Sequence, residues 1–310
     1  MRIKFIIIFL TIATWSMAQS IPHSTLFKYN HMMVNPGYAG MNDGITVNTV
    51  VRNQWMGWEG APNTQNFNAH MPFNLFGAQH GVGLTLMNDE AGFENNIAIG
   101  LNYAFRRDIA EGTLGIGAGF GFYNQTLTAT WDPIDGTGDN LIPADEDEAL
   151  FFDLNFGAFY KTDKLFFGLS VNHLTAPEIK YKNAETTTYP YYQRAAFLTA
   201  GYRYQLSNPL FELEPNIMVY TSGSSTQAAF NAILHYKSRF WGGVGYRVID
   251  AASVMAGAEV IEGLNVGLAY DIPTSQVINA TAGSFEFTVQ YIFKVDLEKD
   301  DRIYRSVRFL

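Results

Sequence analysis

Carboxylates gather in one segment of the chain, between Trp131 and Leu150, where no lysine or arginine separates them. Protein-bound calcium is held by carboxylate and carbonyl oxygens, and residues 132–140 combine aspartates with glycine turns. One interpretation is therefore a loop ordered by structural calcium; the other is a solvated loop without metal, and both stay open. The candidate calcium ligands are Asp132, Asp135 and Asp139.

The remaining titratable residues form no recognisable catalytic or metal-binding motif. No two histidines stand at the spacing of zinc ligands, and the chain has no cysteine. The sequence also contains neither a nucleophile elbow nor a phosphate-binding loop. We therefore expect a protein that is not an enzyme and binds no cofactor other than the candidate calcium. The histidines, expected in the lumen, turns or interfaces, are His23, His31, His70, His80, His173 and His235.

The first 18 residues predict an export signal. Arg2 and Lys4 precede an apolar run at residues 5–13, and the small residues Ser16 and Ala18 suit cleavage before Gln19. The run is short for a membrane helix, so a retained anchor is the less favoured alternative. The formal charge is −9, and removing the two cations of the leader makes it −11, which argues against a nucleic-acid partner.

Long segments after the leader alternate between apolar and polar residues, as strands do. In the segment 96–106, Ile97, Ile99 and Leu101 alternate with asparagine, alanine and glycine. The polar face of such segments is rich in Gly, Asn, Ser and Thr, and aromatic residues lie near the ends of the apolar face. These features favour a lipid-facing outer surface with aromatic girdles over a solvated sheet.

The pattern therefore predicts an all-β fold, a transmembrane antiparallel up-and-down β-barrel of about 14 strands, because an open sheet edge cannot exist in lipid. Connections after even-numbered strands are mostly short, as periplasmic turns are, whereas the segment 72–79 is long for such a turn. The expected strands cover residues 44–52, 63–71, 80–88, 95–106, 112–124, 150–161, 164–173, 190–206, 211–221, 226–237, 239–248, 251–260, 262–271 and 282–293.

Two of these strands carry glycines at every second position, on the face that should point into the lumen. Missing side chains allow the wall to bend, or allow another segment to approach it closely. Both interpretations stay open; in the second, the lumen is partly plugged by residues 20–43 or by the inner part of the loop 53–62. The inward glycines are Gly115, Gly117, Gly119, Gly121, Gly243 and Gly245.

The loop after the first strand, RNQWMGWEGAPNTQ at residues 52–65, combines two tryptophans with several amides. The indole rings either join an aromatic girdle at the membrane interface or fold into the mouth of the barrel, where amides would bond a plug or client chain. The candidate contacts in this loop are Gln54, Trp55, Trp58, Gly60 and Pro62.

Several motifs resemble the PorP/SprF family of type IX secretion system outer-membrane proteins, in order along nearly the whole mature chain. The most specific are KYNHMMVNPGYAG at 28–40, which holds the candidate plug contacts Asn35, Pro36 and Tyr38, and RNQWMGWEGAPNTQNFNAHMP at 52–72. Four further motifs also resemble this family: GVGLTLMNDEAGF, FFGLSVNHLTAP, YKSRFWGGVGYR and GSFEFTVQY, at residues 81–93, 166–177, 236–247 and 283–291.

The resemblance implies an integral outer-membrane component of the secretion and gliding apparatus of Bacteroidota. Its implied partners are outer-membrane lipid, a secreted client such as a large adhesin, and other type IX components, including a periplasmic ring or a peptidoglycan-binding lipoprotein. A family label does not specify the client. The runner-up function is a porin or a channel for small hydrophobic solutes.

The expected organisation is a leader at 1–18, a periplasmic or plug segment at 19–43, a barrel at 44–293 and a periplasmic tail at 294–310. The tail carries acidic residues followed by three arginines, and it is either a disordered extension or a peptide that docks on a periplasmic partner. Its candidate contacts are Arg302, Arg305 and Arg308.

Overall fold

A computed structural model describes residues 22–128, 146–182, 192–223 and 225–294 of the chain. Strands make up most of this part. They are β1 (Ile45–Asn53), β2 (Asn63–Leu75), β3 (Ala78–Ala91), β4 (Glu94–Ile109), β5 (Gly112–Thr128), β6 (Glu146–Lys161), β7 (Leu165–Asn172), β8 (Ala195–Tyr202), β9 (Tyr204–Gln205), β10 (Phe211–Ser222), β11 (Ser225–Tyr236), β12 (Phe240–Arg247), β13 (Ala251–Ile261), β14 (Leu264–Pro273) and β15 (Ser284–Phe293).

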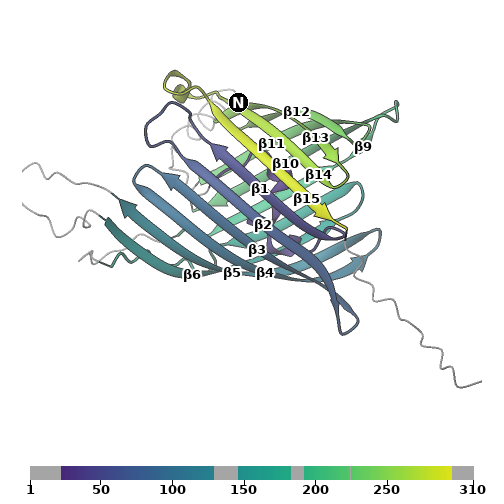
Figure 1. The fold of residues 1–310 in the computed structure, drawn as a ribbon, viewed down its shortest axis with the longest axis horizontal. Helices are drawn as coiled ribbons and strands as arrows, with labels where there is room; N and C mark the ends of the chain where they lie inside the picture. The colour runs from purple at the N-terminus through teal and green to yellow at the C-terminus, as the bar shows by residue number, and fades with distance from the viewer. Residues whose placement is uncertain (1–21, 129–145, 183–191, 224, 295–310) are drawn as a thin grey trace, which may run out of the picture.

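The strands form one closed antiparallel sheet. The first strand, β1, pairs with β2 on one side and with β15 on the other, and β10 joins β8 to β11. Both β8 and β9 pair with β10 and are separated only at Arg203, so they are two parts of one strand. The wall therefore has fourteen strands, which confirms the predicted up-and-down barrel (Figure 1).

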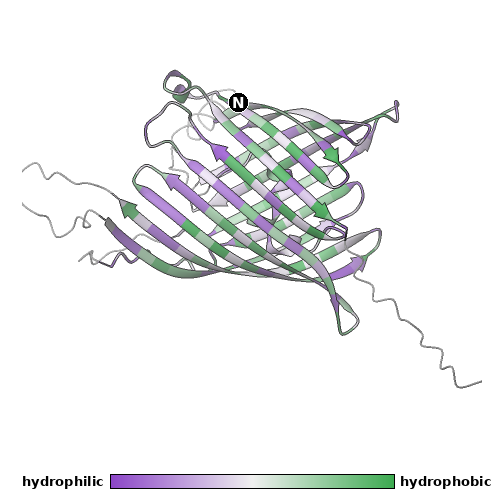
Figure 2. Cartoon of the chain, viewed as in Figure 1, coloured by the Kyte–Doolittle hydropathy of each residue, from purple (hydrophilic) through white to green (hydrophobic). Residues whose placement is uncertain are grey.

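Side chains alternate between the outer and inner faces of the wall. Along β4, Ile97, Leu101 and Phe105 are exposed on the outside, whereas Asn102 and Arg106 are buried inside. Figure 2 shows this alternation as bands of opposite hydropathy along the strands. Because the wall is closed, the backbone groups of every strand are hydrogen-bonded within the sheet. The apolar outer surface is suited to contact with lipid hydrocarbon.

The two ends of the barrel differ. We call the end that carries the hairpin turns 76–77, 110–111, 162–164, 206–210, 237–239 and 262–263 the turn end. It lies on the right in Figure 1. We call the opposite end the loop end, since it carries the longer connections 54–62, 129–145, 173–194 and 274–283, the last with the short helix η3 (Gln276–Asn279).

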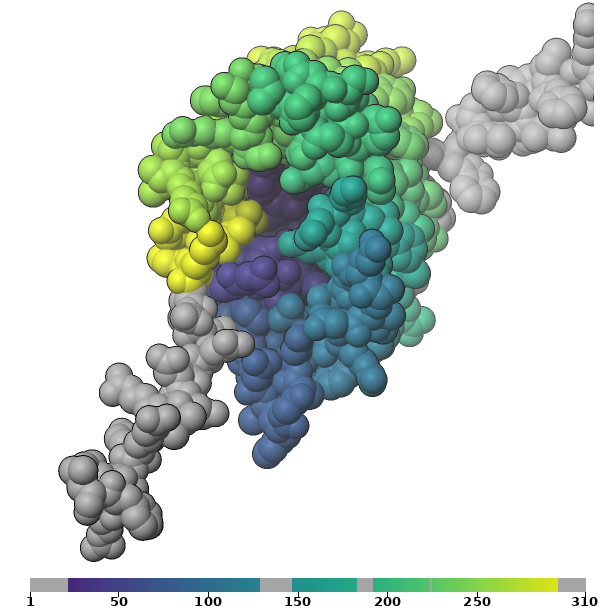
Figure 3. Space-filling model, turned by 90° about the vertical axis from the view of Figure 1, so that its right-hand side faces the viewer, coloured from purple at the N-terminus to yellow at the C-terminus, as the bar shows by residue number. Residues whose placement is uncertain are grey.

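The sequence pattern predicted a long turn at residues 72–79, but the structure has strands in most of this segment. Strands β2 and β3 continue through it, and a two-residue turn at Phe76 and Gly77 joins them, both with positive φ of 52° and 76°. The apolar pattern ended earlier because the hairpin extends beyond the lipid-facing part of the wall (Figures 1 and 3). Strand limits also differ elsewhere; β6 begins at Glu146 and β8 at Ala195, where residues 150 and 190 were expected.

Residues 22–43, here called the plug, fold inside the barrel. They contain three single-turn helices, η1 (Phe27–Tyr29), α2 (His31–Val34) and η2 (Pro36–Tyr38). The last begins where Asn35 accepts a hydrogen bond from the Gly37 N–H at 2.9 Å and Pro36 occupies the first helical position. Within the described residues, no helix is long and apolar enough to cross a membrane.

The hydrophobic core lies between the plug and the wall. Leu26 packs against Ile233 and Trp241, and Phe27 packs against Met218. The sequence pattern predicted a lumen lined by polar and small residues, but the lining also includes apolar residues. Apolar wall residues stand where the plug presents apolar side chains, because buried apolar groups are stabilised by contact with one another and not with water.

Candidate functional site

Two of the inward glycines of β5 allow the plug to touch the wall. A Cβ atom on Gly117 would lie 2.5 Å from the carbonyl carbon of Pro36, and one on Gly115 would overlap the carbonyl oxygen of Gly37. Conversely, a Cβ on Gly37 would lie 2.8 Å from the Gly115 carbonyl oxygen. Backbone thus packs on backbone here, and any side chain at these positions would displace the plug.

The other inward glycines meet the wall itself. A Cβ on Gly119 would approach the side chains of Asn102 and Asn155, and one on Gly121 would approach Tyr123. The glycines of β12, Gly243 and Gly245, likewise face side chains and backbone of neighbouring strands. The interpretation of a plug that approaches the wall therefore describes Gly115 and Gly117, whereas the nearest neighbours of the other four glycines belong to the wall.

Asn35 ties the plug to two wall strands. Its side-chain amide donates to the carbonyl oxygens of Ala158 at 3.0 Å and Leu169 at 3.2 Å, on β6 and β7. The residue is 2% exposed, so these bonds replace contacts with water. Because an unpaired buried amide is unfavourable, this contact fixes the height of the plug in the lumen.

Tyr38 is the centre of an aromatic cluster between plug and wall. Its ring centroid lies 4.9 Å from that of Phe159, 5.2 Å from that of His31 and 5.3 Å from that of His70. The His70 Nδ1 atom accepts a hydrogen bond from the Gly40 N–H at 3.1 Å. The cluster holds the end of the plug that leads into β1, so histidine serves here as a packing and hydrogen-bonding residue.

A buried charge cluster holds the start of the plug near the loop end. The carboxylate of Glu286 accepts hydrogen bonds from the Ser24 hydroxyl at 2.6 Å and from the N–H groups of Thr25 at 2.8 Å and Leu26 at 2.9 Å. The Thr25 hydroxyl donates to Asp271 at 2.8 Å. One glutamate thus binds two successive backbone N–H groups of an extended segment.

Two arginines neutralise these carboxylates. Arg52 lies 2.7 Å from Asp271 and 3.0 Å from Glu286, and Arg247 lies 2.8 Å from Asp271. None of the four residues is more than 5% exposed. We call Arg52, Arg247, Asp271 and Glu286 the loop-end charge cluster. Its formal charge is zero, so removal of any member leaves an uncompensated charge in a buried site.

A second group of charges lies nearer the turn end. The Glu214 carboxylate is 2.7 Å from the Lys28 ammonium, 3.0 Å from Arg203 and 3.1 Å from His235 Nε2. Burial lowers the pKa of Lys28, and the charge of Glu214 partly opposes that shift. Burial also lowers the pKa of His31, in the same part of the plug, to about 3, so its ring is neutral at physiological pH.

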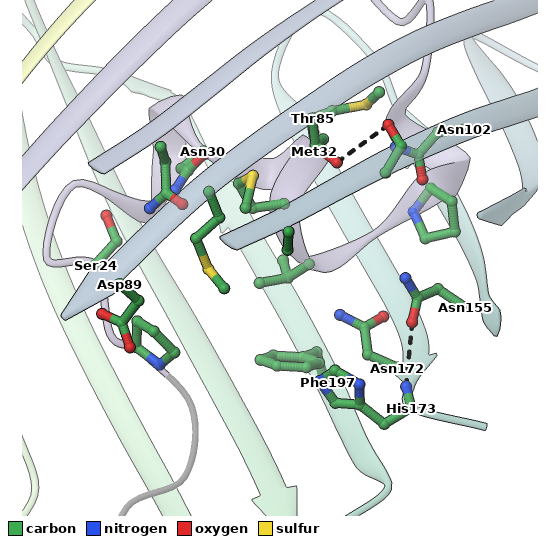
Figure 4. Close-up of a pocket in the computed structure, with 18 of the residues that line it drawn as sticks. Ser24, Asn30, Met32, Thr85, Asp89, Asn102, Asn155, Asn172, His173 and Phe197 are labelled. Carbon is green, nitrogen blue, oxygen red and sulfur yellow. Dashed lines mark hydrogen bonds between the residues drawn. The ribbon is translucent and has the colours of Figure 1, made fainter. Parts of the chain in front are cut away.

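The plug lies between two cavities of the lumen. The smaller, about 130 Å³, is on the loop side and is lined by methionines, asparagines and aromatic rings (Figure 4). Met32, Met87 and Met218 line it together with Asn102 and Phe197. The larger, about 540 Å³, opens toward the turn end, where Figure 3 shows the plug at the bottom of a hollow.

The tryptophan loop folds onto other loops at the loop end. Its ends meet where the Gln54 N–H donates to the Pro62 carbonyl oxygen at 2.9 Å, and Gly60 accepts from the Gly92 N–H at 2.9 Å. The Trp55 N–H donates to the Ser284 hydroxyl at 3.1 Å. The rings of Trp55 and Trp58 lie 6.0 Å apart, and Trp58 is 48% exposed. Neither tryptophan lines the two lumen cavities described above.

Some predicted site residues fall outside the described part of the chain. They are Asp132, Asp135, Asp139, Arg302, Arg305 and Arg308. The calcium site and the docking tail therefore stay predictions. Within the ranges that the structure does describe, no cluster of three or more His, Cys, Asp or Glu residues has metal-binding geometry.

Sequence reasoning missed most residues that hold the plug from the wall side. Strand alternation places Glu286 and Asp271 on polar faces but gives them no role, and Gly81, whose Cβ would overlap the Ala39 carbonyl oxygen, is not among the inward glycines named above. The signal for Gly81 was available, since GVG at 81–83 repeats the alternating glycines of β5. The carboxylates carry no such local signal, because their partners in the plug are more than 200 residues away.

Comparisons with known proteins agree with this architecture. The family described as "Type IX secretion system membrane protein PorP/SprF" matches residues 16–291, whereas no curated protein matches the chain. Among solved structures, the toluene transporter TbuX of Ralstonia pickettii has a TM-score of 0.50 at 10% identity, over 86% of this chain and 94% of that one. The CymD monoaromatic hydrocarbon channel has a TM-score of 0.50 at 11% identity, over 86% and 93%. At these identities the likeness concerns the fold, that of an outer-membrane barrel.

Proposed function

Because the chain belongs to the PorP/SprF family of type IX secretion system membrane proteins, we propose that it assists the export or surface anchoring of client proteins. The clients are large secreted proteins such as adhesins, and gliding motility in a member of Bacteroidota is the corresponding cellular process. Residues 1–18 direct the chain across the inner membrane and are removed before Gln19. Neither role requires the chain to be an enzyme.

The observation that supports this proposal, beside the family, is the plug. A diffusion pore needs an open polar lumen, whereas this lumen contains a segment of its own chain that is bonded to the wall at several heights. Asn35 bonds β6 and β7, and Glu286 bonds the first plug residues. A barrel closed in this way is suited to hold or anchor a protein.

The two ends of the barrel suggest separate contact surfaces. Outer-membrane barrels keep short turns in the periplasm and long loops outside, so the turn end faces the periplasm and the loop end faces the cell surface. On the loop end, Trp55 and Trp58 are candidate contacts for the client. In the periplasm, residues 294–310 contact a ring protein or a peptidoglycan-binding lipoprotein through their arginines.

Deleting residues 296–310 tests this division. The shortened barrel is expected to insert into the outer membrane in normal amounts, whereas the secreted client decreases and ring proteins are lost from a mild-detergent pull-down. Mass spectrometry of the pull-down from the full-length chain also identifies the client. Unchanged export together with unchanged recovery of ring proteins would exclude the docking role of the tail.

A second function, a channel for small hydrophobic solutes, is favoured by the loop-side cavity. Methionines are flexible and polarisable and fit apolar ligands of varied shape, and the cavity, at about 130 Å³, is close to the volume that holds one benzene-sized molecule. The named substrates of TbuX and CymD, toluene and monoaromatic hydrocarbons, are of this kind. Uptake of toluene by proteoliposomes, faster than by empty vesicles, would support this function; conductance in planar bilayers would instead indicate a porin.

A further inference from the structure

The turn-side cavity has the size and position of a binding site that opens to one side of the membrane. Its volume of about 540 Å³ lies within the range of ligand pockets in proteins. The plug forms its floor through Tyr29, His31 and Tyr38, and β6, β10, β11 and β12 contribute to its wall. In Figure 3 the hollow is seen from the turn end, with the plug at its bottom.

Positive charges exceed negative charges in the lining of this cavity, although the whole chain is acidic. Four cationic residues line it against two acidic ones, Asp163 and Glu214. Lys28 and Arg203 both pair with Glu214, which leaves Lys161 and Lys164 against Asp163. A concave site with low-dielectric walls concentrates such a field and attracts anions. The cationic residues are Lys28, Lys161, Lys164 and Arg203.

Lys161 is the cation of this set with the clearest spare capacity. Its ammonium donates to the neutral amide oxygen of Asn42 at 2.7 Å, and no carboxylate of the described residues lies within 4.0 Å of it. An ammonium has three N–H donors, so two remain for a ligand. Because Lys161 lines the cavity, those two donors can bind a ligand that enters from the turn end.

We propose that the turn-side cavity binds the carboxylate of an acidic polypeptide segment that enters from the turn end. Lys161 supplies the charge-assisted hydrogen bonds, and the rings of Tyr29, Phe159 and Phe166 form the apolar part of the lining. The inference goes beyond the export role and does not depend on it.

One source of such a segment is the chain itself. Ile292 lines the cavity, and residues 296–301 contain Asp296, Glu298, Asp300 and Asp301. Residue 296 is only four positions from Ile292, and each residue can span about 3.5 Å. The other source is an acidic segment of another protein, which presents the same chemistry.

Binding of a synthetic peptide tests the proposal. The probe has the sequence of residues 295–301, which carries four side-chain carboxylates and one lysine, and a matched peptide replaces every Asp and Glu by Asn and Gln; both peptides end in an amide. The full-length barrel and a barrel lacking 295–310 are titrated with each in detergent. The acidic peptide is expected to bind the shortened barrel and the amide-substituted peptide to bind it at least tenfold more weakly, since hydrogen bonds to charged groups are the stronger ones.

Substitutions in the lining make the test specific. Lys161→Gln is expected to weaken binding of the acidic peptide roughly tenfold or more. Lys237→Gln is the matched control, because Lys237 is in a turn at the same end but outside the cavity lining. The proposal is overturned if the acidic peptide fails to bind the shortened barrel, or binds the Lys161 and Lys237 variants equally well.

The comparison between the two barrels identifies the source. If the tail of the chain is the natural ligand, the full-length barrel binds the added peptide more weakly than the shortened one, because the site is occupied. If both barrels bind it equally and lose it with Lys161→Gln, the site is free for an acidic segment of another protein. Either result supports the proposal, and heat-modified migration on gels confirms that each variant is folded.

Discussion

Glu286, the third residue of the last wall strand β15, accepts the backbone N–H of Thr25 in the plug at 2.8 Å, across 261 positions of the chain. The same carboxylate accepts the neighbouring N–H of Leu26 and pairs with Arg52. One side chain therefore connects the plug to the strands on either side of the barrel closure, β15 and β1. Plug retention and wall stability depend on the same charge.

Replacing Glu286 by Gln is expected to loosen the plug and destabilise the barrel. The amide preserves the volume and one acceptor, but it leaves Arg52 with Asp271 as its one carboxylate partner, which Arg247 shares. Removing one partner of a buried ion pair destabilises proteins by about 3–5 kcal/mol. Thermal unfolding in detergent and conductance in planar bilayers measure the two effects: a lower melting temperature and a higher conductance.

Glu262→Gln provides the control for this change. Glu262 is at the turn end, where its exposed carboxylate pairs with Lys294. Solvent and salt screen such a pair, so its loss should change neither the melting temperature nor the conductance. Equal behaviour of the two variants would show that the charge of Glu286 does not hold the plug.

Gly117→Ala is expected to push the plug off the wall. The new methyl group would lie 2.5 Å from the Pro36 carbonyl carbon, and overpacking of this kind destabilises by about 1–3 kcal/mol. Gly242→Ala on β12 is the matched control, since its methyl group would meet its nearest neighbour at 3.6 Å, an ordinary contact. Protease sensitivity of residues 22–43 and the melting temperature report the effect. If the two alanine variants behave alike, Gly117 has no role in seating the plug.

The barrel could be predicted from the sequence because strand periodicity is local. Alternation over nine or more residues indicates which residues face lipid, and it needs no knowledge of distant partners. The same rule placed Gly115 and Gly117 on the inner face. It did not detect the ends of β2 and β3 that extend past the bilayer at the turn end, because a strand outside the bilayer does not need an apolar face.

The contacts of the plug could not be predicted in the same way. Whether an inward glycine meets another segment or only its own neighbours depends on which residue lies across the lumen, and Gly117 and Gly119 look alike in sequence. Trp241 shares the inner face with Gly243 and Gly245, yet it packs against Tyr29 at a ring distance of 5.5 Å. These pairings arise from the closed fold and leave no mark in a single sequence.

The stability of the plug is expected to fall in mild acid because of His31. Burial lowers the pKa of His31 from 6.5 to about 3, so between these values the unfolded chain binds a proton that the folded chain excludes. The stability that depends on the neutral ring is complete above pH 6.5 and is lost as the pH falls toward 3, by up to about 1.4 kcal/mol per pH unit. His23, whose pKa burial also lowers, acts in the same direction.

A His31→Phe variant isolates this contribution. Phenylalanine keeps the ring contacts with Phe159 and Phe166, at centroid distances of 5.0 and 4.9 Å, and it cannot be protonated. Melting temperatures measured from pH 7 to pH 4 should fall less steeply for the variant than for the parent chain. Parallel curves would mean that protonation of His31 is not coupled to folding.

Replacing Trp55 and Trp58 together by alanine distinguishes a membrane girdle from a contact surface. Because the loop is held by backbone bonds from Met56 to Gly283 and Ala282, the barrel should keep its melting temperature without the indole rings. Trp58 is 48% exposed at the loop end, so loss of the rings should reduce export or surface retention of the client, measured by proteomics of cell surface and medium. Phe76→Ala, which removes a 97% exposed ring at the opposite end, is the control and should leave export unchanged. A fall in melting temperature with normal export would instead assign the two tryptophans to the aromatic girdle, where indole rings anchor the barrel in the membrane interface.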